Sequence, residues 1–121
     1  MAQVQTVRGA IETARLGVTL MHEHIFVLTP EINQNYPESW GDEESRIRKA
    51  ISQLSELKIK GVDTIVDLTV PGIGRYIPRI QRIAAEVDLN IVVATGFYTC
   101  SELPPYFQFR KPGTPFQNSE P

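Results

Sequence analysis

The stretch Leu16-Gly-Val-Thr-Leu-Met-His-Glu-His24 decides how this chain is interpreted. Its apolar part, Gly17 to Met21, predicts a β-strand that ends directly before two histidines, His22 and His24. Side chains two positions apart in a strand point to the same face, with Cα atoms about 6.6 Å apart. Two imidazoles in that arrangement can converge on one divalent metal ion, or they can act as hydrogen-bonding side chains at a strand end. The spacing alone leaves both interpretations open.

Composition places the chain among ordinary globular proteins. Its 121 residues, 41% hydrophobic and 21% charged, allow at most one domain. A net charge of −2 gives no electrostatic reason to expect nucleic acid or an anionic membrane as a partner. The apolar runs are far shorter than the ~20 residues of a membrane span, and the N-terminal residues lack a hydrophobic signal core. With a single cysteine, Cys100, we expect a cytoplasmic protein without an internal disulfide.

Strands and helices are predicted to alternate after a short N-terminal hairpin. Apolar residues at 3- and 4-residue spacings predict helices over 42–60 and 77–87, and a long loop is expected at 30–41. The strands, of which the first two form the hairpin, are expected at 4–7, 10–13, 17–21, 62–68 and 91–95. The order after the hairpin indicates an α/β fold with a parallel sheet and right-handed crossovers.

Polar residues follow the three predicted parallel strands at their carboxyl ends. His22 and His24 follow the first strand, Asp67 stands at the end of the second, and Tyr98 comes shortly after the third. Functional residues of parallel sheets collect at this edge. Asp67 has two possible roles, orienting a histidine or making a loop hydrogen bond. Tyr98 can contact a substrate or pack under the loop that follows it.

Four segments together resemble the phosphotriesterase family of the amidohydrolase superfamily, and most of all the phosphotriesterase-like lactonases. They are residues 16–24, Gly61-Val-Asp-Thr-Ile-Val-Asp-Leu-Thr69, Gly72-Ile-Gly-Arg75 and Asn90-Ile-Val-Val-Ala-Thr-Gly-Phe-Tyr98. The segments stand in the family's order, and the resemblance covers residues 3–110. It implies the first three βα units of a (β/α)8 barrel preceded by a hairpin, within residues 1–110. Residues 111–121, rich in proline, are expected to form an irregular tail.

The resemblance also implies a metal centre and its chemistry. His22 and His24 match the pair that binds the more buried of two divalent metals, with zinc expected first and cobalt, manganese or iron as alternatives. Tyr98 matches the lactonase tyrosine beside the metals and the substrate, and Phe26 and Val27 are expected to line the pocket. The implied reaction is hydrolysis of lactones, N-acyl homoserine lactones in particular, or of organophosphate triesters, by a metal-bridging hydroxide. A full-length relative is expected to form a homodimer.

The chain departs from the family in length. The family's other metal ligands lie on strands four, five, six and eight, and no position in the 121 residues can be assigned to them. A complete barrel of this type needs ~250 residues. We therefore expect no turnover from these residues alone. We also expect a marginally stable fold that associates through its unpaired sheet edges.

Two functions of other classes stay open. A truncated, non-catalytic remnant can bind a partner through its exposed edges. A small flavodoxin-like module can instead bind phosphate at the turn Gly72-Ile-Gly-Arg75, before the second helix. Phosphate binding of that kind depends on Arg75 and is indifferent to His22.

Overall fold

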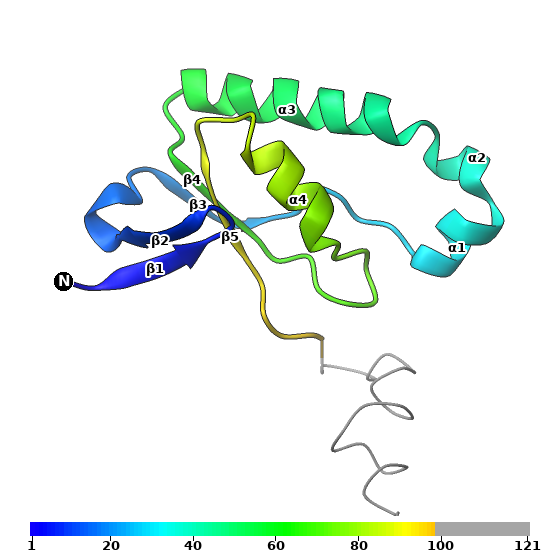
Figure 1. Ribbon diagram of the computed structural model, residues 1–121, viewed down its shortest axis with the longest axis horizontal. Helices are drawn as coiled ribbons and strands as arrows, with labels where there is room; N and C mark the ends of the chain where they lie inside the picture. The colour runs from blue at the N-terminus through cyan, green and yellow to red at the C-terminus, as the bar shows by residue number, and fades with distance from the viewer. Residues whose placement is uncertain (99–121) are drawn as a thin grey trace, which may run out of the picture.

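A computed structural model describes residues 1–98 as a parallel sheet with helices on one side and an N-terminal hairpin beside it (Figure 1). The strands are β1 (Gln3–Thr6), β2 (Gly9–Glu12), β3 (Thr19–Glu23), β4 (Thr64–Asp67) and β5 (Asn90–Val93). The helices are η1 (Thr13–Arg15), α1 (Pro30–Asn35), α2 (Pro37–Trp40), α3 (Glu43–Ile59) and α4 (Ile77–Ala84). The predicted order of the hairpin, the three parallel strands and the two longer helices is confirmed. The predicted tail at 111–121 lies outside the described residues.

The three parallel strands form a sheet in the order β3-β4-β5, with β4 in the middle. β1 and β2 form a separate antiparallel hairpin, joined to the sheet where the Val7 amide donates to the Ile91 carbonyl at 2.9 Å. The pairing of β3 with β4 shifts register between Leu20 and Glu23. This irregularity lies at the carboxyl end of β3, where His22 and His24 stand on either side of Glu23.

The predicted loop at 30–41 is wrong in one respect, because it contains two short helices, α1 and α2. Pro30 and Pro37 stand in their first turns, where a missing N–H costs nothing and the fixed φ favours the helix. Neither helix buries a residue. Elements this short carry no apolar stripe, so the prolines and asparagines of this segment predicted a loop instead.

Helix α3 begins and ends where the sequence predicts. The Asp42 carboxylate caps its first turn by accepting a hydrogen bond from the Ser45 amide at 2.8 Å. Hydrogen bonds from the Ser45 side chain and the Ser45 amide hold the pKa of Asp42 below its ordinary value. At the other end, Gly61 follows the C-cap Lys60 with a φ of 97°, a conformation that glycine adopts without strain. The helix therefore presents one defined face to the sheet.

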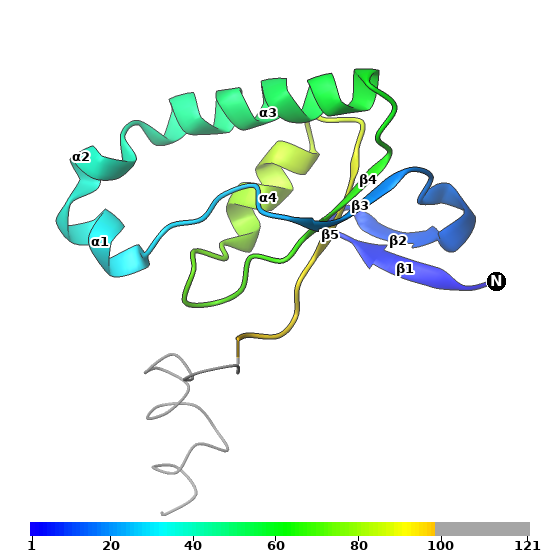
Figure 2. The same cartoon turned by 180° about the vertical axis from the view of Figure 1, so that it is seen from behind.

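The hydrophobic core lies between the sheet and the two longer helices (Figure 2). Ile65 of β4 and Ile91 of β5 are each 1% exposed, and Ile83 of α4 is fully buried. The buried members of the core are Ile47, Ala50, Leu54, Ile65, Ile80, Ile83, Ala84, Val87, Leu89 and Ile91. Burial of each large aliphatic side chain contributes about 1.5–3 kcal/mol, so this layer holds the strands in place.

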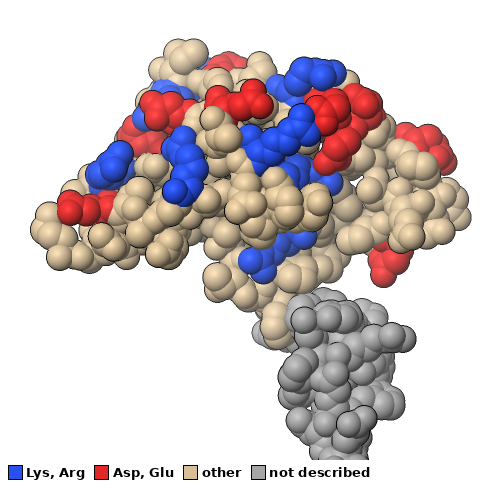
Figure 3. Space-filling model, viewed as in Figure 1, with Lys and Arg blue, Asp and Glu red and all other residues tan. Residues whose placement is uncertain are grey.

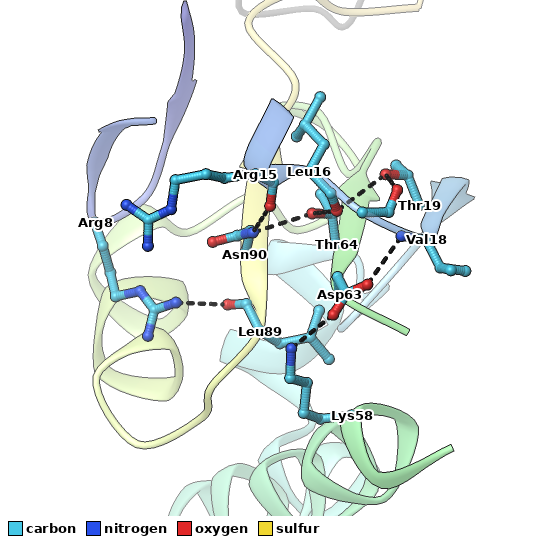
Figure 4. A network of polar contacts seen from close by, with 11 residues as sticks. Arg8, Arg15, Leu16, Val18, Thr19, Lys58, Asp63, Thr64, Leu89 and Asn90 are labelled. Carbon is cyan, nitrogen blue, oxygen red and sulfur yellow. Dashed lines mark hydrogen bonds and ion pairs between the residues drawn. The ribbon is translucent and has the colours of Figure 1, made fainter. Parts of the chain in front are cut away.

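Polar contacts fix the amino-terminal edge of the sheet (Figure 4). The Asp63 carboxylate accepts from the Val18 amide at 3.0 Å and from Lys58 Nζ at 2.7 Å, and the hydrogen bond with Lys58 lowers the pKa of Asp63. The Arg8 guanidinium, from the hairpin turn, donates to the Leu89 carbonyl at 3.1 Å. These contacts anchor the segments before the strands, on the edge opposite to the histidines.

Charged residues of both signs are interspersed over the helical side of the molecule (Figure 3). Two ion pairs connect α3 with α4, one between Glu43 and Arg79 and one between Glu44 and Arg82, each at 2.5 Å. No single-sign patch stands out on this face. None of the helices in residues 1–98 is both long and apolar enough to cross a membrane.

Candidate metal centre at the carboxyl edge of the sheet

The two histidines lie side by side at the end of β3. Their ring centroids are 5.4 Å apart with an interplanar angle of 67°. β3 runs from Thr19 to Glu23 rather than from 17 to 21, so His22 lies inside the strand and His24 directly follows it. His22 is exposed and His24 is half-buried. The predicted placement of both imidazoles together is confirmed, despite the register shift before them.

The segment directly after the neighbouring strand β4 provides an anchor for His24. The Thr69 hydroxyl oxygen lies 3.0 Å from His24 Nδ1, and the same hydroxyl donates to Asp67 Oδ1 at 2.5 Å. Asp67 Oδ1 also accepts the Thr69 backbone N–H at 3.0 Å. Asp67 therefore makes a loop hydrogen bond and also connects with a histidine, through Thr69. The sequence indicated Asp67 but not Thr69, whose link to His24 depends on the pairing of β3 with β4.

Phe26 and Val27, which are expected to line a substrate pocket, have different neighbours from each other. The Phe26 ring packs edge-on against Trp40, with centroids 5.4 Å apart, and lies 5.3 Å from the Arg79 guanidinium. Val27 is 57% exposed and lines a pocket of about 190 Å³ together with α1 and Trp40. Both residues lie between the histidines and the short helices.

Tyr98 stands beyond the end of β5, and its side chain is 45% exposed. Within residues 1–98, the polar and ring contacts of the two histidines are with each other and with Thr69. Tyr98 is not among these partners. Its expected contact with a substrate stays a prediction.

The ion pair between Arg79 and Glu43 lies next to the Phe26 ring. The Arg79 side chain is only 9% exposed and is held by Glu43 at 2.5 Å, while its guanidinium faces the rings of Phe26, Trp40 and Tyr76. Burial opposes ionisation of Glu43, but hydrogen bonds from Arg79 and Trp40 outweigh it, so the pKa of Glu43 is lowered. Arg79 therefore fixes the aromatic cluster against α3.

The glycine turn from Gly72 to Arg75 is occupied by internal contacts. The amides of Ile73 and Arg75 both point to the Val70 carbonyl, and the Ile73 carbonyl accepts from the Leu28 amide at 3.1 Å. A Cβ on Gly74 would approach Leu28 within 2.9 Å, so glycine allows this close passage. The helix starts only at Ile77, so this turn does not form the helix N-terminus that phosphate binding requires.

The two imidazoles lie close enough together to share one metal ion. A zinc ion lies about 2.1 Å from a ligating nitrogen, and that nitrogen lies about 1.1 Å from its ring centroid, so the centroids of two ligating rings can be at most about 6.4 Å apart. The observed separation of 5.4 Å meets this limit, and imidazole suits zinc, iron and similar ions. Within residues 1–98, no group of three or more His, Cys, Asp or Glu side chains converges on a common point. A metal site at this edge would therefore need ligands in addition to these two imidazoles.

Comparison with known proteins decides the family. The model of the phosphotriesterase family matches residues 2–116. The chain belongs to the phosphotriesterase family. This family consists of divalent-metal hydrolases, which agrees with two imidazoles at a strand end. It also leaves the flavodoxin-like alternative without support.

Three relatives show how broad this family is. The phosphotriesterase homology protein of Mycobacterium tuberculosis is 61% identical over 99% of this chain, which covers 37% of that protein. The aryldialkylphosphatase of Saccharolobus solfataricus is 35% identical over 83% of this chain, and the match covers 32% of the aryldialkylphosphatase. The N-acetyltaurine hydrolase of Dictyostelium discoideum is 25% identical over 89% of the chain, covering 42% of that enzyme. The chain therefore spans well under half the length of these relatives.

A solved structure confirms the fold class. The phosphotriesterase from Mycobacterium tuberculosis matches 93% of this chain with a TM-score of 0.85 and 63% identity, and the match covers 35% of that structure. The hairpin and the first strands and helices of this chain are thus the opening part of a (β/α)8 barrel, as predicted. The barrel is incomplete in this chain.

Proposed function

We propose that this chain forms the strand-one side of the metal centre in a hydrolase that opens lactones, preferably N-acyl homoserine lactones. Organophosphate triesters are proposed as secondary substrates. The observation that carries the proposal is the pair of adjacent imidazoles, 5.4 Å apart, in a chain of the phosphotriesterase family. The aryldialkylphosphatase relative supports the organophosphate activity. The lactone preference rests on the resemblance around Tyr98.

Each residue has a role in this proposal. His22 and His24 would hold a divalent metal, zinc first, as part of a two-metal centre. A bound divalent metal acts as a Lewis acid and lowers the pKa of water, which makes hydrolysis possible near neutral pH. Tyr98 would contact the substrate, while Phe26 and Val27 would form the pocket wall on the side of α1 and α2.

The complete activity requires protein beyond the described residues. Two neutral imidazoles leave most positions of a metal ion to water, so affinity and selectivity are low. We therefore propose that the 121 residues alone do not turn over substrate. For the complete protein we propose a homodimer in the cytoplasm, on the grounds of the family resemblance and of the composition.

A second proposal, a non-catalytic fragment that binds a partner, has one supporting observation. Val18, just before the edge strand β3, is 59% exposed, and Met21, within β3, is 68% exposed. Apolar residues at a sheet edge favour association with another chain. This function predicts that activity appears only when a complementary barrel fragment is added.

A chimera tests the proposed catalytic function. Residues 1–98 would be joined to the remaining part of the 61%-identical Mycobacterium tuberculosis relative. We expect zinc-dependent hydrolysis of an N-acyl homoserine lactone, weaker hydrolysis of paraoxon, and loss of both with a chelator. His22→Ala and His24→Ala should each lower kcat/KM by about 100-fold or more, because each removes a metal ligand.

The control variant is Ile59→Ala, whose side chain is 86% exposed at the far end of α3. It should leave hydrolysis unchanged. Tyr98→Phe should lower kcat/KM for the lactone. Full activity in a chimera that lacks both histidines would refute the proposed metal site, and paraoxon turned over faster than the lactone would reverse the substrate preference.

A further inference from the structure

We propose that Thr69, held by Asp67, is a positioning residue that fixes His24 in the Nδ1–H tautomer and so leaves Nε2 available to a metal ion. The inference deepens the proposed function and rests on it only for the role of His24 as a ligand. The tautomer itself follows from contacts within the metal-free chain.

Three oxygen and nitrogen atoms surround the Thr69 hydroxyl. Asp67 Oδ1 lies at 2.5 Å, His24 Nδ1 at 3.0 Å and the Phe26 carbonyl oxygen at 3.3 Å. Thr69 is 5% exposed and Asp67 is 2% exposed. Water therefore has little access to the hydroxyl, and its hydrogen bonds must be made with these neighbours.

Counting protons assigns the tautomer. A threonine hydroxyl has one hydrogen to donate. The Phe26 carbonyl can only accept, and Asp67 Oδ1 accepts from the Thr69 hydroxyl at 2.5 Å as well as from the Thr69 backbone N–H at 3.0 Å. Whichever oxygen receives the hydroxyl hydrogen, none remains for His24. His24 Nδ1 must then be the donor, and in a neutral imidazole the lone pair is left on Nε2.

The second histidine lacks such an anchor. His22 is exposed, and within residues 1–98 its only ring contact is with His24. Its tautomer is therefore set by solvent. The two candidate ligands divide into one that is oriented in advance, His24, and one that adapts when the metal binds. A hydrogen bond to the non-ligating nitrogen of a histidine orients the ring and raises its basicity.

The tautomer can be measured on the whole metal-free chain of 121 residues. Imidazole ¹⁵N chemical shifts distinguish Nδ1–H from Nε2–H, and His22 serves as a reference in the same spectrum. At a pH where both rings are neutral, we expect the Nδ1–H form for His24 and solvent-like averaging for His22. A His24 signal like that of His22, or in the Nε2–H form, overturns the proposal.

Two substitutions separate the positioning role from a structural one. Thr69→Val keeps the side-chain shape but removes the hydroxyl, whereas Thr69→Ser retains it. Thr64→Val is the matched control, because Thr64 is fully buried in β4 and its hydroxyl donates to the Leu16 carbonyl at 2.5 Å, away from the histidines. We expect only Thr69→Val to abolish the Nδ1–H form of His24.

Zinc titration of the same variants gives a second readout that needs no catalysis. Loss of an outer hydrogen-bond partner of a ligating histidine weakens metal affinity by about 10–100-fold. Thr69→Val should show this loss, while Thr69→Ser and Thr64→Val should not. An unchanged affinity in Thr69→Val, or an equal loss in Thr64→Val, would overturn the proposal. A confirmed tautomer in a chain whose chimera is inactive would reject the proposed function alone.

Discussion

The middle strand and the first strand of the sheet differ in how completely this chain surrounds them. In β4, Thr64, Ile65 and Asp67 are at most 2% exposed, and strands pair with it on both sides. In β3 no residue is fully buried, and Met21 is 68% exposed. The fold is thus held by the centre of the sheet, whereas the histidines stand on an edge that these residues leave open. The best-packed strand and the strand that carries the two candidate metal ligands are therefore adjacent but distinct.

Replacement of one residue in each strand should give the largest contrast. Ile65→Ala removes a side chain that is 1% exposed, and we expect the free energy of unfolding to fall by about 2–5 kcal/mol. Met21→Ala, at the exposed edge, should change it by less than about 0.5 kcal/mol. Urea denaturation measures both. An equally large loss in Met21→Ala would mean that the edge is covered in solution.

Two glycines at the amino-terminal side of the sheet differ in how tightly their surroundings are packed. Gly17, before β3, has a φ of 57°, and a Cβ there would collide with the Asp63 carboxylate. Gly61 has a φ of 97° but open space around it. Gly17→Ala should lower the free energy of unfolding by about 2–3 kcal/mol, because it strains the backbone and disrupts the Asp63 contacts. Gly61→Ala should lower it by roughly 1–2 kcal/mol, through backbone strain alone. Equal thermal shifts in the two variants would contradict this account.

The smallest effect concerns pH and the contact between α3 and α4. Because the folded-state pKa of Glu43 is lowered, its contribution to stability is present above the ordinary value of 4.5 and is lost as pH falls through the folded-state pKa. The effect should stay below about 1 kcal/mol, since 40% of the Glu43 side chain is exposed to screening solvent.

Glu43→Gln should flatten this part of the stability profile, measured by denaturation at a series of pH values. Glu31→Gln is the control, because Glu31 is exposed and has no ion pair within residues 1–98. A profile that Glu43→Gln leaves unchanged would show that the Arg79 contact contributes nothing to stability.

Local patterns in the sequence predicted most of the framework. The apolar spacing over 42–60 predicted α3 within one residue at each end, since Asp42 and Gly61 supply clear signals for a start and a stop. The spacing of His22 and His24 predicted the contact of their rings. Both features depend on neighbours in the sequence, which a single chain displays directly.

Features that depend on pairing between distant segments were not predictable in this way. Thr69 lies 45 residues from His24, and their contact requires the register between β3 and β4, including its shift. Nothing in the local sequence around Thr69 indicates a histidine partner. The cluster of Phe26, Trp40 and Arg79 likewise joins a strand end, a short helix and α4, and so became evident only in the folded chain.

The metal content of the barrel chimera shows whether the end of β3 binds metal ions. After zinc loading and dialysis, we expect about two ions per chimeric barrel, the number implied for the family. In the variant with both His22→Ala and His24→Ala, the count should fall to about one or less, while Ile59→Ala should keep the full count. A double variant that retains the full metal content with wild-type affinity would contradict the claim that the end of β3 supplies two of the metal ligands.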